Sequence, residues 1–261
     1  MTNREIEVSL GAKRAVRQRC AFGCVICGLP VFQYDHIYGY TLENADDPAA
    51  ITLLCPRHHD EKTKELLPLA KVVAANEAPF NVKNGVSAPY EMHYDGQESA
   101  IHIGSCSFTG IGTYVCALLW RDEEVIAFDF NEGQLSLNVN LRDRAGNLTL
   151  SIIDNELIYS VHPWDIEFVG RMLTVRQGLG DIMFKLFFQT PFAIRLARAT
   201  LAYEDVTINI NAKKIKVVGP MIPALGSPRI REFERISMHG IRYGIVLDCS
   251  RPILGVAGIM T

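Results

Sequence analysis

The fold of the N-terminal part is decided by residues 51–63, which read ITLLCPRHHDEKT. The apolar run at residues 51–54 predicts a short strand, and Pro56 suits the first turn of a helix that follows it. In that helix His58 and His59 are neighbours, so their side chains should point about 100° apart. This stretch therefore predicts a strand and a helix that present two histidines in two different directions.

Two pairs of potential metal ligands lie on either side of a hairpin-length insertion. Cys24 and Cys27 form the first pair, and Cys55 and His58 form the second. Four sulfur and nitrogen ligands can close a tetrahedral structural zinc site. Such an ion would offset the thin core of a module of about 80 residues. We therefore expect these four side chains to hold a structural Zn²⁺, and we expect Cys20 to be a core residue rather than a ligand.

A second set of metal-binding groups lies close to the first. Asp35 and His36 fall in a predicted hairpin arm over residues 31–40. If His58 faces the zinc ion, His59 faces away from it and toward this arm. The sequence therefore predicts a second site lined by Asp35, His36 and His59.

Together these stretches resemble the HNH nucleases of the ββα-metal superfamily. The family pattern runs C-x-x-C-G, then D-H-I, then N-L-x-L-L-C-x-x-C-H-x-x-K-T. The corresponding stretches here are CVICG at residues 24–28, DHI at residues 35–37 and the stretch at residues 51–63. The resemblance covers residues 14–66, roughly a fifth of the chain, and we identify no catalytic family in the remainder.

The resemblance implies a role for each matching residue. His36 would be the general base that deprotonates the attacking water, which suits a side chain whose free pKa is near 6.5. Asp35 and His59 would hold one catalytic divalent cation, Mg²⁺ or another first-row ion. Arg57 and Lys62 would contact phosphates beside the scissile bond. The nucleic acid is expected to be DNA rather than RNA.

The chain departs from the family pattern at Ala50, where relatives have an asparagine that orients the base or supports the metal. Loss of such positioning commonly costs orders of magnitude in rate. Four nearby polar residues are candidates to replace the amide, and they are Asn44, Asp46, Asp47 and Thr52. Two functions therefore stay open: an active endonuclease, and a zinc-folded scaffold that binds nucleic acid or a protein partner without cutting.

Composition and charge describe an ordinary globular chain. Of its 261 residues 48% are hydrophobic and 21% are charged, and the net charge is −3, so any nucleic-acid contact must come from a local patch. The seven cysteines are an odd number and favour zinc over disulfides in a reducing compartment. No apolar run reaches the roughly 18 residues of a membrane span, and the first residues lack a signal core. A cytoplasmic protein without a membrane partner is expected.

The period of the apolar residues changes to two from about residue 91, which predicts successive strands. We therefore expect an α+β protein with a nuclease module at 1–77, a linker at 78–90 and a mostly antiparallel β-rich domain at 91–261. This domain is expected to be a sandwich, a barrel or a small solenoid, with Trp164 at the edge of its core. Its expected roles are targeting, regulation as in bacterial defence, or assembly with a second copy or a protein partner.

Overall fold

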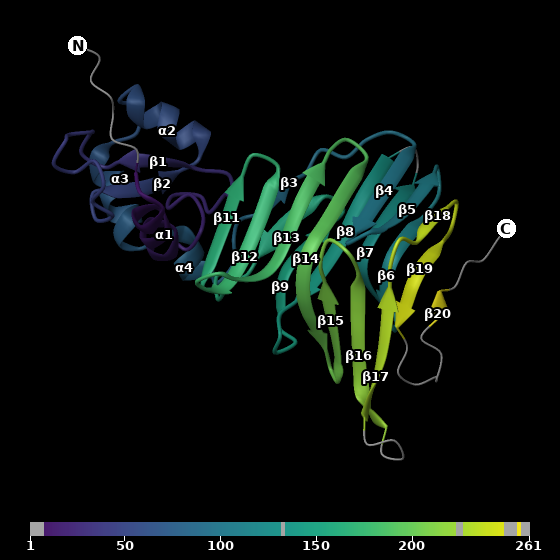
Figure 1. Ribbon diagram of the computed structural model, residues 1–261. Coiled ribbons are helices and arrows are strands. Elements are labelled where there is room, and N and C mark those ends of the chain that lie inside the picture. The colour runs from purple at the N-terminus through teal and green to yellow at the C-terminus, as the bar shows by residue number, and fades with distance from the viewer. Residues whose placement is uncertain (1–7, 132–133, 223–226, 248–254, 257–261) are drawn as a thin grey trace, which may run out of the picture. The chain divides into compact units, whose positions relative to one another are not determined.

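The computed structural model describes residues 8–131, 134–222, 227–247 and 255–256 (Figure 1). It shows an α+β protein with few helices and mostly antiparallel strands, as the sequence predicts. The chain divides into two compact units. Unit 1 comprises Met1–Tyr90 and Ile158–Phe168, and unit 2 comprises Glu91–Leu157 and Val169–Thr261.

Unit 1 contains all four helices of the described residues and one small hairpin. Its elements before residue 90 are α1 (Leu10–Arg19), β1 (Gln33–His36), β2 (Ile51–Leu54), α2 (Pro56–Thr63), α3 (Leu69–Glu77) and α4 (Phe80–Asn84). Helix α1 begins after Ser9, whose side chain accepts a hydrogen bond from the backbone of Ala12 at 3.2 Å. Strands β1 and β2 pair antiparallel, with His36 opposite Ile51, and Pro56 opens α2 directly after β2. The strand, hairpin and helix predicted around residues 31–63 are therefore present.

Residues 78–90, expected to be a linker, instead belong to unit 1. They contain α4, in which Asn81 is fully buried and donates from Nδ2 to the Ala21 carbonyl at 2.9 Å. Gly28, at φ 76°, lies so close to this helix that a Cβ there would be 2.4 Å from Asn81 Oδ1. This segment is therefore a short helix packed on unit 1 rather than a linker. Its sequence lacks a periodic apolar pattern because the side-chain amide of Asn81 makes a contact that an apolar side chain would otherwise make.

A segment far along the chain, Ile158–Phe168, completes unit 1. The Tyr159 hydroxyl donates to the Phe22 carbonyl at 2.6 Å. Asp165 accepts from Nε and Nη2 of Arg17, each at 2.8 Å, and both side chains are buried. Trp164, expected at the edge of the β core, lies instead in unit 1, where its ring is 4.8 Å from the Arg14 guanidinium. A module bounded at 1–77 is therefore incomplete, because the buried Arg17 pairs with Asp165, which lies 148 residues later in the chain.

The hydrophobic core of unit 1 is small. Its buried members come from α1, the cysteine knuckle, β2 and the segment after α2, and they are Val16, Cys20, Cys24, Val25, Ile51, Leu53, Leu54, Cys55, Leu67 and Val72. Cysteines thus form part of the core itself, next to the end of β2. Specific polar contacts and the cysteine cluster therefore supplement apolar burial in this unit.

The first sheet of unit 2 is built from hairpins. Its strand order is β20-β19-β6-β7-β8-β9, and every neighbouring pair that the structure details is antiparallel except β19 with β6. The bounds are β6 (Val115–Trp120), β7 (Glu123–Asn131), β8 (Gln134–Arg142), β9 (Leu148–Ile153), β19 (Tyr243–Leu247) and β20 (Gly255–Val256). The strands β3 (Tyr90–Glu91), β10 (Glu156–Tyr159) and β11 (Asp165–Val169) contain the three points at which the chain passes from one unit to the other.

The second sheet of unit 2 branches at its longest strand. Along the order β12-β13-β14-β15-β16-β17 all pairs are antiparallel, and β14 also pairs in parallel with β4 through Ala193–Leu196. The bounds are β4 (Glu98–Ile103), β5 (Cys106–Ile111), β12 (Met172–Gly178), β13 (Asp181–Gln189), β14 (Ala193–Tyr203), β15 (Val206–Ile210), β16 (Ile215–Ile222), β17 (Ser227–Phe233) and β18 (Ser237–His239). Strand β5 joins β4 to β18.

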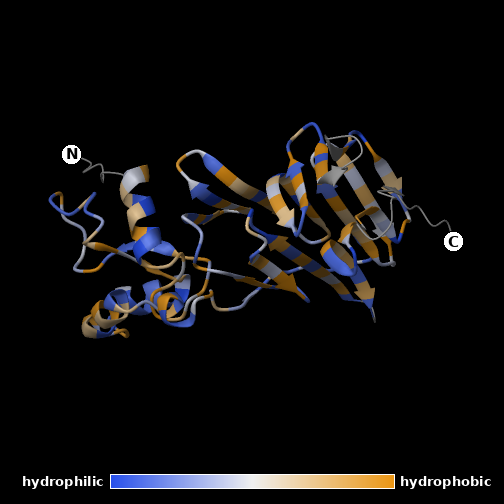
Figure 2. Cartoon of the chain, turned by 90° about the horizontal axis from the view of Figure 1, so that it is seen from below, coloured by the Kyte–Doolittle hydropathy of each residue, from blue (hydrophilic) through white to orange (hydrophobic). Residues whose placement is uncertain are grey.

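The two sheets of unit 2 pack on each other as a sandwich. Figure 2 shows hydrophobic and hydrophilic residues alternating along many strands, and in β8 the alternate residues Leu135, Leu137, Val139 and Leu141 are buried. Between the sheets, Phe108 of β5 lies so close to Gly244 of β19 that a Cβ on this glycine would be 2.6 Å from the ring. The Tyr203 hydroxyl of β14 donates to the Asn140 carbonyl of β8 at 2.7 Å. Of the predicted β architectures, the sandwich is therefore the one observed.

Candidate metal centre and the adjoining acid–histidine site

The four side chains predicted to hold a structural metal converge in unit 1. Cys24 and Cys27 lie in the turn after α1, Cys55 is the residue before α2, and His58 lies in the first turn of that helix. His58 Nδ1 is 3.4 Å from Cys24 Sγ and 3.3 Å from Cys55 Sγ. Cys27 Sγ is 3.8 Å from Cys55 Sγ, and all four ligand atoms lie within 4.8 Å of one another. Among the described residues, no other group of three or more such ligands comes together.

The spacing of these atoms suits a tetrahedral ion. With Zn–S bonds of about 2.3 Å and Zn–N bonds of about 2.0 Å, the edges of a tetrahedron are roughly 3.8 Å between sulfurs and roughly 3.5 Å between sulfur and nitrogen. The sulfur–sulfur separation of 3.8 Å and the sulfur–nitrogen separations of 3.3 and 3.4 Å agree with those edges. The cluster could therefore hold a structural metal ion such as Zn²⁺. Cys20 is buried elsewhere, with its Sγ 3.9 Å from Thr52 Oγ1, and is not a member.

The three thiols of the cluster cannot all ionise easily without a cation. A hydrogen bond from Cys27 lowers the pKa of Cys24 to about 4. Giving that hydrogen bond raises the pKa of Cys27 far above its ordinary value, and burial raises the pKa of Cys55. One thiolate is thus favoured and the next two are disfavoured, which is the arrangement that a positive ion at the centre would relieve.

His59 points to the other side of α2, as its position next to His58 requires. Its Nε2 is 3.5 Å from Oδ1 of Asp35 on β1. Two ligands that share one ion at about 2.0–2.2 Å can have this separation, so the pair fits a single divalent cation. The Asp35 side chain is only 11% exposed and the His59 side chain 35%, which leaves the site open on the histidine side.

Lys62 occupies the other oxygen of Asp35. Its Nζ is 2.6 Å from Asp35 Oδ2 and donates to the His36 carbonyl at 2.7 Å, and its side chain is 16% exposed. The resemblance implies a contact of this lysine with substrate phosphates, but its ammonium is directed inward and holds the end of β1. Five residues earlier, Arg57 is 78% exposed and pairs with Glu61 at 2.8 Å, so its predicted phosphate contact stays a prediction.

His36 follows Asp35 on β1, and position 50, across the hairpin from it, is an alanine without a polar side chain. The edge of the His36 ring meets Tyr40, with ring centroids 5.2 Å apart, and its Nε2 is buried with no hydrogen-bond partner among the residues that the structure describes. Ala50 is opposite the next residue, since its carbonyl accepts from the Ile37 amide at 2.8 Å. No spacing rule in the sequence connects Tyr40 to His36, so this contact is visible only in the structure.

None of the four polar residues proposed to replace the asparagine of the family pattern supports His36. Asn44 bonds to the backbone of Thr41 and Gly39 in its own loop. Asp46 accepts from the Ser9 amide, Asp47 accepts from the Ala49 amide, and Thr52 faces Cys20. The polar groups near Ala50 in sequence are therefore engaged in contacts with other residues.

Comparison with protein-family models, with curated proteins and with solved structures gives no match to this chain. Among the described residues, no helix has both the length and the apolar character that crossing a bilayer would require. The chemistry of the site is accordingly inferred from its own residues.

Proposed function

We propose that this chain is a metal-dependent HNH-type endonuclease that hydrolyses phosphodiester bonds of nucleic acid, with DNA as the expected substrate. One observation carries the proposal. The neighbouring histidines of α2 divide their roles, since His58 joins the cysteine cluster while His59 Nε2 lies 3.5 Å from Asp35. This is the arrangement that the resemblance to the ββα-metal nucleases implies.

Each residue then has a stated task. The cysteine cluster with His58 fixes the start of α2 relative to the knuckle, and so fixes where His59 points. His36 accepts the proton of the attacking water, and the Tyr40 ring restricts its orientation. Asp35 and His59 hold a divalent cation, which would stabilise negative charge at the scissile phosphate and on the leaving oxygen. Lys62 anchors Asp35 and the backbone of His36 in place.

The Lys62 ammonium already neutralises one oxygen of Asp35. An ion bound between Asp35 and His59 can use the other oxygen, which faces the histidine. The proposed cation and Lys62 therefore share one carboxylate. This sharing predicts weak binding of the catalytic ion compared with binding of the structural one.

The test is cleavage of plasmid DNA and of RNA with Mg²⁺, Mn²⁺, Ni²⁺ or Zn²⁺ supplied. The wild-type chain should cut with at least one of these ions, and His36→Ala should not cut while keeping its structural ion. His93→Ala is the matched control, because His93 is an exposed histidine of unit 2, and it should cut normally. If the wild-type chain cuts neither nucleic acid with any of the four ions, the proposal fails.

A second candidate function is a metal-folded scaffold that binds nucleic acid or a protein and leaves it intact. It is favoured by the buried Nε2 of His36, which has no hydrogen-bond partner in the described part of the chain, and by the alanine at position 50. Ala50→Asn discriminates the two functions. A large gain in cleavage would show that the amide was limiting in a working nuclease, whereas a mobility shift of nucleic acid without cleavage by either form would favour the scaffold.

A further inference from the structure

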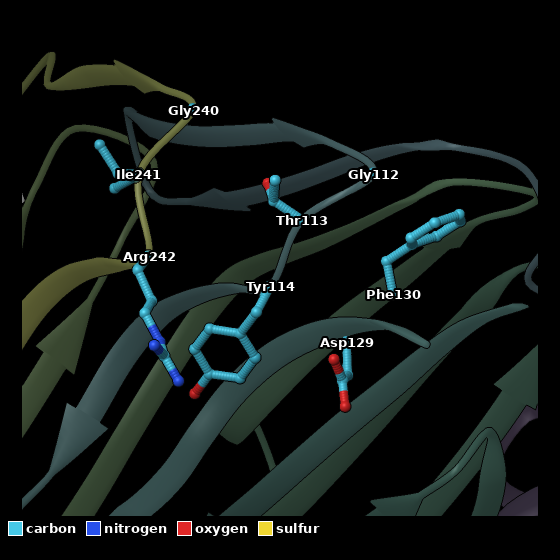
Figure 3. A pocket seen from close by; sticks show the side chains of 8 residues that line it. All are labelled: Gly112, Thr113, Tyr114, Asp129, Phe130, Gly240, Ile241 and Arg242. Carbon is cyan, nitrogen blue, oxygen red and sulfur yellow. The ribbon is translucent and has the colours of Figure 1, made fainter. Parts of the chain in front are cut away.

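Unit 2 has a pocket of its own, with a volume of about 420 Å³. It lies between the turn that joins β5 to β6, the end of β7 and the residues just before β19 (Figure 3). The residues that line it are Gly112, Thr113, Tyr114, Asp129, Phe130, Gly240, Ile241 and Arg242. None of them belongs to the metal centre or to the acid–histidine site.

Aromatic rings hold the guanidinium of Arg242 in this pocket. Its centre is 5.6 Å from the ring of Tyr114 and 5.6 Å from the ring of Tyr243, and these rings are 5.7 Å apart. The Tyr114 hydroxyl donates to Glu124 at 2.7 Å, which fixes the ring and uses its polar group. Burial raises the pKa of Tyr114 well above its ordinary value, so this hydroxyl remains a donor. The guanidinium is thus positioned by ring faces.

Arg242 differs from the other arginines that lie over aromatic rings in the described parts of the chain. Each of those arginines also has a carboxylate partner, and the pairs are Arg14 with Asp165, Arg121 with Glu204 and Arg142 with Glu123. Arg242 makes no ion pair with any described residue. Its planar fork of donors therefore stays available for an anion that enters the pocket.

The rest of the lining supplies an acceptor and apolar walls. Asp129 of β7 likewise makes no ion pair with a described residue. Its backbone is paired with Ser136 of β8 in the sheet. Figure 3 shows the side chains of Arg242, Tyr114 and Asp129 extending in the same direction. Phe130 and Ile241 extend away from these three side chains and provide apolar surface elsewhere in the lining, and Ile241 is 8% exposed. One cation, one carboxylate and the Tyr114 ring thus share one side of the pocket.

We propose that this pocket binds a small organic anion that carries a planar ring with an N–H donor. The anionic group would pair with Arg242, the ring would pack beside Tyr114, and the N–H would donate to Asp129. The volume of about 420 Å³ lies in the range of small-ligand sites. Purine nucleoside monophosphates, through the phosphate, and tryptophan, through the carboxylate, share this chemistry. The proposal is independent of nuclease activity, since it concerns unit 2 alone.

Titration calorimetry on the full chain tests the proposal with four probes, each at up to about 1 mM. GMP and L-tryptophan are the complete probes, and guanosine and inorganic phosphate each supply half of the chemistry. Binding of GMP, with both halves about tenfold weaker or worse, supports a nucleotide ligand. Binding of L-tryptophan alone supports an amino-acid ligand. Binding of neither complete probe, or of phosphate as tightly as GMP, overturns the proposal.

Variants locate the binding in the pocket. Arg242→Gln should weaken the bound probe about tenfold or more, because a charge-assisted pair is lost, and Asp129→Asn should weaken it less. Arg171→Gln, at an exposed arginine of unit 2 outside the pocket, is the matched control and should bind normally. Arg242→Lys keeps the charge without the fork and should bind with intermediate affinity if Arg242→Gln fails to fold. Unchanged affinity in a folded Arg242 variant would refute the assignment.

Discussion

Unit 1 and unit 2 are held together by different means. In unit 2 alternate residues of long strands enter a continuous apolar core, so stability is spread over many equivalent side chains. In unit 1 a short buried list is supplemented by single contacts, among them the cysteine cluster and the buried pair of Arg17 with Asp165. A small core can therefore be completed by a few specific contacts, and each of these contributes more to the stability of its unit than one side chain of a large core does.

The largest difference between the units is expected when one thiolate is removed from the cluster. Cys55→Ser should abolish tight binding of the structural ion and unfold unit 1, while unit 2 keeps its own transition. The apparent binding free energy of a structural Zn²⁺ in small zinc peptides is about 10–16 kcal/mol, so the stability of unit 1 should fall by several kcal/mol. Bound metal is measured by elemental analysis and folding by circular dichroism and calorimetry.

The control for this variant is Cys20→Ala, which alters a buried cysteine outside the cluster. It should lower stability modestly and keep its ion. If Cys55→Ser retained the ion and the unit 1 transition, the cluster would not be what completes the core.

The next largest effect is expected at the buried ion pair. Burial alone would lower the pKa of Arg17, but the hydrogen bonds and charge of Asp165 and Tyr34 outweigh it and raise this pKa. Arg17 therefore stays charged, and Asp165→Ala would remove its two-oxygen partner and leave only Glu167, 3.3 Å from Nη1, and the Tyr34 hydroxyl beside that buried charge. Breaking such a pair typically costs about 3–5 kcal/mol. Urea unfolding should show the loss in unit 1 only, and an equal loss in unit 2 would contradict the assignment of residues 158–168 to unit 1.

Unit 2 offers the opposite experiment. Leu137 of β8 is fully buried opposite Phe128 in the first sheet. Leu137→Ala should cost about 2–5 kcal/mol by leaving a cavity, and the loss should fall on the unit 2 transition. Bound metal should not change. A fall in metal content in this variant would show that the two units unfold as one.

The sequence reveals the parts of unit 1 that depend on local spacing. Residues 51–58 predict the strand, the helix start and the two ligands of the cluster, because strand length, a proline in the first turn and a three-residue step are all local rules. The Ser9 cap of α1 is predicted for the same reason. The alternation of apolar residues likewise predicts the β-rich body, although not the choice of a sandwich.

The remaining contacts follow no local rule. Arg17 and Asp165 are 148 residues apart, and no periodic signal marks either as buried. Asn81 reads as a linker residue because a buried amide that replaces apolar contacts looks polar in sequence. Lys62 reads as a surface lysine because only the hairpin brings Asp35 within reach. Each of these polar side chains has a partner that only the fold supplies.

The affinity of the cluster for its ion should depend on pH. Cys24, with its pKa lowered to about 4, is already a thiolate at pH 7, whereas the raised pKa values of Cys27 and Cys55 keep those thiols protonated. Binding of the ion must displace these two thiol protons, so affinity should fall as the pH falls. Two protons correspond to about a hundredfold per pH unit, or about 2.7 kcal/mol. Calorimetry in buffers of different ionisation enthalpy counts the protons, and release of three from the thiols would contradict the assignment of Cys24.

The smallest effect is expected when one buried tyrosine hydroxyl is removed from each unit in turn. In unit 1 the Tyr159 hydroxyl donates at 2.6 Å to the carbonyl of Phe22, a residue held at φ 62°, and Tyr159→Phe would leave this buried acceptor without its donor. In unit 2 the Tyr94 hydroxyl makes the matching bond to the Ala193 carbonyl at 3.2 Å. Both variants keep the ring and its packing. Burial raises the pKa of both phenols, so both hydroxyls stay protonated and the comparison holds across neutral pH.

Tyr159→Phe should cost about 1–2 kcal/mol and lower the unit 1 transition alone. Tyr94→Phe should cost less, because its bond is longer, and should lower the unit 2 transition alone. Calorimetry of both variants beside the wild-type chain measures the two shifts. Equal losses in the two variants would mean that a single contact matters no more in the small core than in the large one, and the contrast between the units would then rest on the metal cluster and the Arg17 pair.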